Sequence, residues 1–271
     1  MTTVIWNGKP RPADEASLSP KGDGVQFGAG VFTTVRVRGG RAELLPQHLA
    51  RLRRDAVAIG LTPPDNATGL LERIGECTTQ NAIEQGGVKV VWLADREGRT
   101  AEWIAPRPHG YGPEQVARGF RLQTRGCEVR EQRTLIRHKT TNYLEHLIAK
   151  RAALSAGFDE ALWINERGEV LEGATTNLFL VRHGELITPP VESGLLPGVV
   201  RACLLDERRF PRVRVARVSR GELLSAEEVF VTNALAGVMP VRAVDEHVFD
   251  WENNPVTRRV AEVFDEVSRS A

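Results

Sequence analysis

The chain has 271 residues, 41% of them hydrophobic, which is enough to bury the core of one large domain or of two ordinary ones. Its 36 lysine and arginine residues are balanced by 35 aspartate and glutamate residues, so no broad basic surface is expected for nucleic acid or membrane lipid. We expect a cytoplasmic protein without a disulfide or a metal site, because the sequence has no signal-peptide pattern, no apolar run of bilayer length and no CxxC or Cys/His cluster.

The first part of the chain predicts helices and strands of an α/β domain. Apolar residues at helical spacing follow Pro46 and end at Gly60, and a second helical pattern covers residues 68–80. Strands separated by glycine-containing turns are expected at residues 4–6, 32–37, 41–44, 88–93 and 102–104.

The second part predicts further α/β elements. A helix over residues 142–155 ends at Gly157, a short helix follows Pro197-Gly198, and the last helix begins at Asn254-Pro255. The apolar face of the first of these helices is expected to comprise Tyr143, Leu144, Leu147, Ile148 and Ala152. Strands are expected at residues 120–124, 160–164, 177–181, 185–188, 213–217 and 229–232.

A stretch rich in proline and glycine, residues 105–113, divides the chain. We expect a smaller N-terminal α/β domain at residues 1–112, a linker at residues 113–120 and a larger C-terminal domain at residues 121–271. The sequence therefore predicts two α/β domains joined by a proline-rich crossing.

Lys139 is a candidate catalytic residue. Only five of the 36 basic residues are lysine, so a lysine in this chain has a raised chance of being needed as an amine, which arginine cannot supply. Taken alone, a lysine between a strand and a helix, as in IRHKTTNYLEHL, is usually a solvated loop residue. Four further segments accompany it in order: QHLARL upstream, and VLEGATTNLFL, SGLLPGVVR and VTNALAGVMPV downstream.

These ordered segments, with QFGAGVFTTVRV near the start, resemble the fold-type IV pyridoxal-phosphate enzymes, the class IV aminotransferases. That family contains branched-chain aminotransferases, D-amino acid aminotransferases and 4-amino-4-deoxychorismate lyases. The resemblance extends from Trp6 to Val241, which is most of the chain. It implies the two-domain α/β (α+β) fold of the D-amino acid aminotransferases, pyridoxal 5'-phosphate as cofactor, a small-molecule amino substrate and a homodimer.

Cofactor contacts follow from the same resemblance. Lys139 corresponds to the lysine that forms the Schiff base and moves the substrate proton. Glu172 corresponds to the carboxylate on the pyridine nitrogen, and Arg51, in the pattern HxxRL, to the clamp on the phosphate. As alternatives, Glu172 is a mere strand-end carboxylate and Arg51 an exposed arginine of its helix. Further contacts are implied for the amides of Val199 and Val200 at a helix start, for Leu195 or Leu196, and for Thr232 and Asn233.

Three positions depart from the family pattern. Val200 and Ala234 stand where a hydroxyl residue commonly contacts the phosphate, so we expect lower cofactor affinity unless Thr232 or water substitutes. Ala29 replaces the usual acidic residue and is given no role. The candidate substrate-binding residues are Phe32, Thr34, Lys89, Arg107, His109 and Tyr143. Arg107 and His109 are explained equally well as polar linker residues, and Lys89 as a strand residue that faces solvent.

Two reactions fit the resemblance. A lyase uses Lys139 to remove the ring proton of 4-amino-4-deoxychorismate and expels pyruvate, leaving 4-aminobenzoate for folate synthesis. An aminotransferase passes the amino group of a D-amino acid or a branched-chain L-amino acid to a keto acid. Thr33-Thr34, the Lys-Thr-Thr-Asn spacing and NALAGVMPV resemble the lyases, whereas VKVVWLADREGRT lacks the Arg-Gly that commonly follows this strand.

We favour the lyase on resemblance alone. A third reading is a binding protein that has the fold but no catalytic activity. The joint presence of Lys139, Glu172 and Arg51 argues against it, because a chain without cofactor has no evident need for all three.

Overall fold

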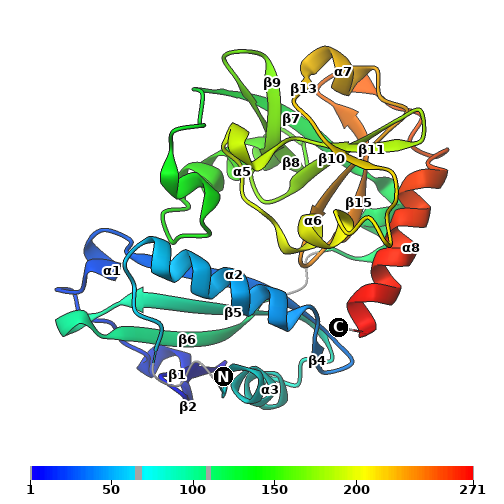
Figure 1. The fold of residues 1–271 in the computed structure, drawn as a ribbon. Coiled ribbons are helices and arrows are strands. Elements are labelled where there is room, and N and C mark those ends of the chain that lie inside the picture. The colour runs from blue at the N-terminus through cyan, green and yellow to red at the C-terminus, as the bar shows by residue number, and fades with distance from the viewer. Residues whose placement is uncertain (1, 65–68, 108–110, 271) are drawn as a thin grey trace. The chain divides into compact units, whose positions relative to one another are not determined.

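The chain folds into two compact units. The computed structural model describes residues 2–64, 69–107 and 111–270. The first unit comprises the described residues up to 107 together with residues 138–142, and the second comprises residues 111–137 and 143–270 (Figure 1). The chain therefore returns to the first unit for a short segment in the middle of the second.

An antiparallel six-stranded sheet forms the first unit, in the order β2-β1-β6-β5-β3-β4. Its strands are β1 (Thr3–Trp6), β2 (Lys9–Pro12), β3 (Gly30–Arg38), β4 (Arg41–Ala42), β5 (Gln85–Ala94) and β6 (Thr100–Arg107). Its helices are α1 (Asp23–Gln26), α2 (Leu45–Ala58) and α3 (Leu70–Gln80), with short 3-10 turns at Ala13–Glu15 and Arg96–Gly98. Pro46 lies in the first turn of α2, where a backbone N–H would have no intrahelical acceptor, and Gly60 follows the end of the helix with φ of 72°.

Along each strand of this sheet, successive side chains point to opposite faces. Val35 is opposite Val88 across β3 and β5, and Trp92 lies farther along β5 on the same face, where all three are fully buried. α2 and α3 pack on this face through side chains that include Leu52 and Ile74. The opposite face carries side chains of the candidate site.

A ten-stranded mixed sheet forms the second unit. Its strands are β7 (Phe120–Cys127), β8 (Glu160–Asn165), β9 (Glu169–Gly173), β10 (Asn177–Arg182), β11 (Glu185–Thr188), β12 (Val213–Val215), β13 (Val218–Ser219), β14 (Glu228–Asn233), β15 (Gly237–Val244) and β16 (His247–Val248). Its helices are α4 (Pro113–Arg118), α5 (Leu144–Ser155), α6 (Val199–Leu204), α7 (Arg220–Leu224) and α8 (Pro255–Ser270), with 3-10 turns at Thr134–Arg137 and Val191–Ser193. A short pairing of β9 with β10 closes β10, β14, β15, β7, β8 and β9 into a ring.

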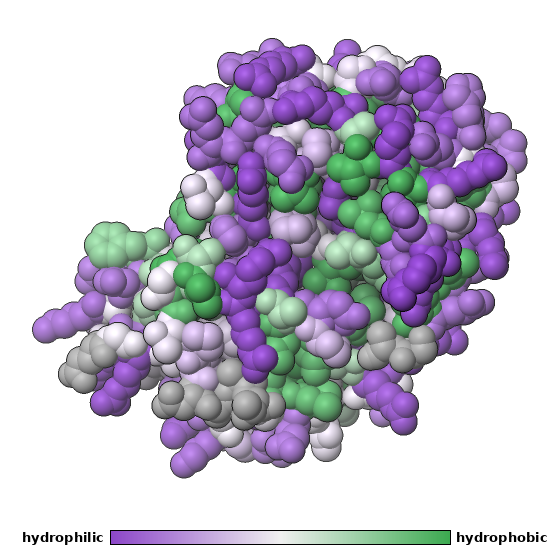
Figure 2. All heavy atoms as spheres, in the orientation of Figure 1, coloured by the Kyte–Doolittle hydropathy of each residue, from purple (hydrophilic) through white to green (hydrophobic). Residues whose placement is uncertain are grey.

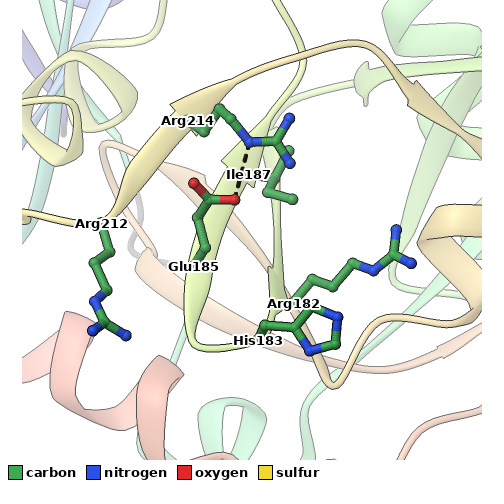
Figure 3. Close-up of a pocket in the computed structure, with 6 residues that line it drawn as sticks. All are labelled: Arg182, His183, Glu185, Ile187, Arg212 and Arg214. Atoms are coloured by element: carbon green, nitrogen blue, oxygen red, sulfur yellow. Dashed lines mark hydrogen bonds and ion pairs between the residues drawn. The ribbon is translucent and has the colours of Figure 1, made fainter.

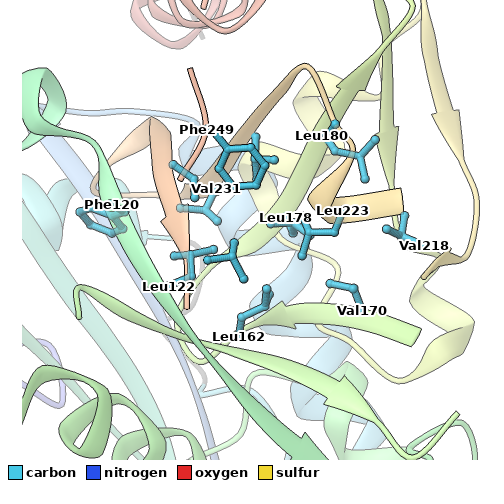
Figure 4. Packing of buried hydrophobic residues seen from close by; sticks show 14 of the residues in the cluster. Phe120, Leu122, Leu162, Val170, Leu178, Leu180, Val218, Leu223, Val231 and Phe249 are labelled. Carbon is cyan, nitrogen blue, oxygen red and sulfur yellow. The ribbon is translucent and has the colours of Figure 1, made fainter. Parts of the chain in front are cut away.

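Each strand of this ring contributes to one apolar cluster (Figure 4). Leu178 and Val231 belong to it and are opposite each other across β10 and β14. A slip of either strand by one residue would turn its own side chain out of the cluster, so the burial of both fixes the register of the two strands. The next pair along the same two strands is Asn177 and Thr232, whose side chains point to the opposite face of the sheet. Both residues belong to the candidate site.

Helix α5 turns a different face inward from the one expected. Leu144, Leu147 and Ile148 are 65%, 41% and 56% exposed, whereas Ala149 and Ala153 are buried. The helix packs on β8 through these alanines, whose small side chains permit a close approach to the sheet. The prediction that the large aliphatic residues of α5 face the core is therefore wrong.

Residues 113–120, the expected linker, contain α4 and the beginning of β7. Pro113 occupies the first turn of α4, and Gln115 Oε1 accepts a hydrogen bond from the Gly112 amide at 3.1 Å. The proline that suggested a linker thus starts a helix. Strand β15 was not among the expected strands, and it contains Pro240, although proline is rare inside strands.

Hydrophilic side chains cover much of the face shown in Figure 2, with hydrophobic ones between them. None of the helices in the described part of the chain combines the length and the apolar character that a membrane span requires.

Candidate functional site

Three polar side chains of α2 lie on one side of the helix, beside β3. His48, Arg51 and Asp55 are three and four residues apart, and each is 8% exposed or less. Thr33 of β3 contacts two of them: its Oγ1 lies 2.7 Å from His48 Nδ1 and accepts a hydrogen bond from Arg51 Nη2 at 3.0 Å. Arg51 is therefore a buried, oriented side chain and not an exposed arginine of the helix surface.

His48 contributes no charge to this group near neutral pH. Burial, followed by the charges of Arg51 and Lys139, lowers the pKa of His48 well below its usual value. A neutral imidazole has one acceptor nitrogen, so Nδ1 can accept the Thr33 hydroxyl hydrogen while the hydroxyl oxygen accepts from Arg51. The Thr33 hydroxyl, which is hydrogen-bonded to the neutral His48, thus helps to orient the Arg51 guanidinium.

Residues 138–142 lie along the part of the β3 edge that β4 does not cover. Phe32 N donates to Lys139 O at 2.9 Å, and Thr141 N donates to Gly30 O at 2.9 Å. The two bonds follow the pattern of an added antiparallel strand. They place Lys139 at the edge of the sheet of the first unit.

The Lys139 side chain lies against a ring that it shares with another lysine. Its Nζ is 4.6 Å from the centroid of the Phe32 ring, and Lys89 Nζ is 4.4 Å from the same centroid. Thr34 is directly opposite Lys89 across β3 and β5, and strand parity puts Arg107 of β6 on this face as well. Four of the predicted substrate-binding residues therefore share one sheet face.

This face concentrates positive charge. Burial, with a smaller contribution from Arg107, lowers the pKa of Lys89. Within the described part of the chain neither side chain has a carboxylate partner. An anionic ligand suits such a surface. His109, the remaining basic candidate, lies outside the described residues.

In the second unit, Glu172 and Asn177 are the register partners that close the ring of strands. Asn177 Nδ2 donates to Glu172 Oε2 at 3.1 Å and to Leu196 O at 2.8 Å. Leu196 N lies 3.2 Å from both carboxylate oxygens of Glu172. The Glu172 side chain, 4% exposed, is thus a buried and oriented carboxylate and not a solvated strand end.

A buried hydroxyl lies beside this pair. Thr232 is opposite Asn177 across β10 and β14, and its Oγ1 has no hydrogen-bond partner among the residues described. Gly198 approaches Asn177 so closely that a Cβ at this position would lie 2.1 Å from Oδ1. Val199 and Val200 follow in the first turn of α6, where backbone amides have no intrahelical acceptor. Hydrogen-bond donors of β14 and α6 are therefore available near Asn177.

Three other predicted residues have contacts within the second unit. Leu195 is 1% exposed. Asn233 Oδ1 accepts the Ala236 amide at 2.8 Å and so shapes the turn between β14 and β15. The Tyr143 hydroxyl donates to Ala174 O at 3.0 Å. The sequence pattern did not reveal these structural contacts of Asn233 and Tyr143.

Asp55 was missed in the sequence. It accepts the Lys139 amide at 3.0 Å, so it is a residue of α2 that contacts the lysine segment directly. A signal was present, since Asp55 follows Arg51 by four residues in HLARLRRDA and so lies on the same side of the helix.

A hollow of about 550 Å³ lies in the second unit, lined by Arg182, His183, Glu185, Ile187, Arg212 and Arg214 (Figure 3). It contains none of the predicted site residues. Arg214 donates to Glu185 at 2.9 Å, and Arg182 lies 3.8 Å from Glu222, so two of its arginines already have carboxylate partners. We assign it no ligand.

Residues 30–244 match the family described as Amino-transferase class IV. The matched stretch contains Arg51, Lys139, Glu172 and Thr232, and it covers well over half of the chain.

Similarity to individual proteins extends over nearly the whole chain. D-alanine aminotransferase from Bacillus licheniformis is 28% identical over 274 residues, which cover 95% of this chain and 94% of that protein. Branched-chain aminotransferase from the thermophilic archaeon Thermoproteus uzoniensis, solved with norvaline, has a TM-score of 0.88 and 26% identity, covering 100% of this chain and 96% of that one. A Legionella pneumophila protein, "Putative 4-amino-4-deoxychorismate lyase", has a TM-score of 0.85 and 25% identity, covering 93% and 95%.

Proposed function

The chain belongs to the class IV aminotransferase family and is a pyridoxal-phosphate-dependent enzyme, and we propose that it acts as a 4-amino-4-deoxychorismate lyase. The products are 4-aminobenzoate and pyruvate, which together contain all the atoms of the substrate. The observation that carries the proposal is the charge of the sheet face at Lys139, where Lys89 and Arg107 have no carboxylate partner in the described part of the chain.

The residues present fit the cofactor. The buried Thr232 hydroxyl and the first-turn amides of α6 suit a phosphate, and the hydroxyl offsets the loss of side-chain donors at Val200 and Ala234. Arg51 offers a guanidinium fork already oriented by Thr33. The family resemblance gives cofactor roles to Glu172 and Leu195 as well as to the residues just described. Asn233 contributes indirectly, because it shapes the turn between β14 and β15.

Lys139 is the proton-moving residue in this proposal. Pyridoxal phosphate, when bound, supplies an electron-withdrawing ring. Lys139 Nζ removes a proton from the substrate ring, and the C–O bond to the enolpyruvyl group breaks with its electron pair on oxygen. Enolpyruvate takes up a proton to become pyruvate, and the remaining ring becomes aromatic, which makes the step favourable. Glu172 holds a proton at the pyridine nitrogen by accepting its hydrogen bond.

Charge favours a dianionic substrate. 4-Amino-4-deoxychorismate carries two carboxylates, whereas alanine and leucine carry one. Lys89 and Arg107 are two cations on one face, and the charge of Arg107 disfavours that of Lys89. A dianion provides one partner for each of them, with the Thr34 hydroxyl beside Lys89 as a further donor. Phe32 offers an apolar surface to the substrate ring.

An aminotransferase is the second candidate. It is supported by the similarity to D-alanine aminotransferase over nearly the full length of both chains. A single carboxylate of an amino acid would then bind at Arg107 or Lys89, and Lys139 would move the α proton of the amino acid instead of a ring proton.

Product analysis separates the two reactions. Purified protein is mixed separately with 4-amino-4-deoxychorismate, D-alanine and L-leucine while the cofactor absorbance and the products are followed. We expect 4-aminobenzoate and pyruvate in equal amounts with no lasting change of the cofactor spectrum. Conversion of the cofactor to the pyridoxamine form by either amino acid, with keto acid released and no 4-aminobenzoate formed, would establish the aminotransferase instead.

A homodimer in the cytoplasm completes the proposal, on the family resemblance. The exposed Leu144, Leu147 and Ile148 of α5 support an assembly that covers apolar surface. Light scattering should give twice the chain mass of 29.9 kDa for the wild type and a lower mass for Ile148→Glu. A wild-type protein that remains monomeric would contradict the dimer and leave the reaction proposal standing.

A further inference from the structure

We propose that Asp55 is the positioning residue of the active-site lysine. Its buried carboxylate joins the main chain at Lys139 to α2, the helix that also carries Arg51. The inference rests on the proposed role of Lys139 as the residue that attaches to the cofactor. It does not depend on whether the enzyme is a lyase or an aminotransferase.

Both oxygens of Asp55 are used. Oδ2 accepts the backbone N–H of Lys139 at 3.0 Å. Oδ1 lies 2.9 Å from His138 Nδ1 and accepts from Arg54 Nη2 at 2.6 Å. Because the Asp55 side chain is only 1% exposed, these are the contacts that satisfy a charge held away from water.

The contact matters because it completes the restraint on the lysine backbone. Lys139 O accepts from Phe32 N on β3, and Lys139 N donates to Asp55 on α2, so the peptide groups on both sides of its Cα are held. A lysine side chain has four flexible carbons, so the place of its amine depends strongly on where its Cα and Cβ are fixed. Asp55 therefore sets the direction in which the lysine leaves the sheet edge.

Pairing with Arg54 does not explain this carboxylate. The Arg54 side chain is 48% exposed, and ion pairs with exposed partners contribute little to stability. The two other contacts of the carboxylate involve the His138 ring and the Lys139 backbone N–H, which both belong to the segment that lies along β3. A role in holding the lysine segment accounts for both.

The test compares two cofactor forms on the cofactor-free full chain. Attachment of pyridoxal phosphate joins its aldehyde carbon to Lys139 Nζ with loss of water and is followed by visible absorbance, whereas pyridoxamine phosphate binds without this bond. In Asp55→Ala we expect the attachment rate to fall at least about tenfold, with the dissociation constant of pyridoxamine phosphate changed less than about threefold. Asp55→Asn, whose amide oxygen can still accept the Lys139 N–H, should recover most of the rate, and Arg54→Ala should leave it nearly unchanged.

Two results would overturn the inference. One is an attachment rate in Asp55→Ala within about twofold of the wild type; the other is an equal loss for both cofactor forms, which indicates a purely structural role. If Asp55→Ala does not fold, hydrogen exchange in the wild type decides, because a Lys139 amide that exchanges as fast as an open loop cannot be held by Asp55. A failure of the proposed lysine role gives a result that neither of these outcomes gives. Borohydride reduction of the wild type with bound pyridoxal phosphate would then leave the cofactor on no peptide that contains Lys139.

Discussion

Lys89 lies directly opposite Thr34 in the antiparallel pair of β3 and β5, so the two side chains leave the sheet together on the face that Lys139 approaches. An ammonium and a hydroxyl side by side form a donor pair for a carboxylate. The relationship follows from strand register, which makes it a fixed property of the sheet.

Replacing Lys89 by methionine should weaken substrate binding. Loss of a hydrogen bond to a charged group costs about 1.5–3 kcal/mol, so kcat/KM should fall by about 10- to 100-fold, mostly through KM. Because the pKa of Lys89 is lowered, the side chain loses its charge at a lower pH than an ordinary lysine, and the wild-type kcat/KM should decline at that lower pH. This alkaline decline should be absent in Lys89→Met. Lys9→Met, on the exposed strand β2, is the matched control, and an unchanged KM in Lys89→Met would remove Lys89 from the substrate site.

Lys139→Ala should abolish turnover and leave the fold intact. The amine is lost, but the main-chain bonds of residue 139 to β3 and α2 remain. We expect a fall in kcat of at least about 10²-fold with an unchanged unfolding midpoint, measured by steady-state kinetics and circular dichroism. Lys21→Ala, at an exposed position, serves as the control. Activity within a few-fold of the wild type would exclude Lys139 as the catalytic residue.

Glu172→Gln should retain the cofactor and slow the proton transfer. The glutamine keeps the size of the side chain but removes the charge that favours a protonated pyridine nitrogen. A charge-assisted hydrogen bond of about 1.5–3 kcal/mol corresponds to about a 10- to 100-fold loss in kcat. Pre-steady-state kinetics with a deuterated substrate measure this step, and an unchanged rate would mean that the pyridine nitrogen is held by another group.

The buried His48 should make the protein less stable in mild acid. Its pKa is lowered in the folded state from the usual 6.5, so below that pH the unfolded chain binds a proton that the folded chain does not. Stability is therefore lost as pH falls below 6.5, with a slope of up to about 1.4 kcal/mol per pH unit. Denaturant unfolding at several pH values should show a smaller slope for His48→Asn and an unchanged slope for the exposed His247→Asn.

Cys77 should resist alkylation in the folded protein. Burial, with a smaller contribution from Glu76, raises the pKa of Cys77 to about 11, and the side chain is fully buried. Mass spectrometry after iodoacetamide treatment should find Cys77 modified only when the protein unfolds, and after Cys127 and Cys203, which are less buried. Labelling of Cys77 before unfolding would show that the core around α3 opens readily.

The sequence predicted those parts of the candidate site that lie in short, linear motifs. Lys139, Glu172 and Arg51 lie in compact motifs, and the structure places each of them in an ordered environment. Asp55 could not be found in this way, because its partner is more than eighty positions away in the chain and the contact depends on how α2 packs against β3. Such long-range hydrogen bonds leave no periodic signal in a sequence.

The fold was predicted best where local chemistry decides the structure. The start of α2 at Pro46 and the turn at Gly60 were both readable. The orientation of α5 was not, because large aliphatic side chains normally face the core, and only the packing of Ala149 and Ala153 against β8 shows that they do not here. Strand β15 contains Pro240, which lies opposite Phe230 of β14, so here pairing with a neighbouring strand outweighs the local preference of proline.

The return of residues 138–142 to the first unit has a consequence for biosynthesis. During translation the chain completes β3 long before these residues are made, so part of that strand edge waits without its final partner. Exposed strand edges are prone to pair with other chains. We therefore expect a fragment that stops before residue 111 to aggregate. The lysine segment thus also covers part of the open edge of β3.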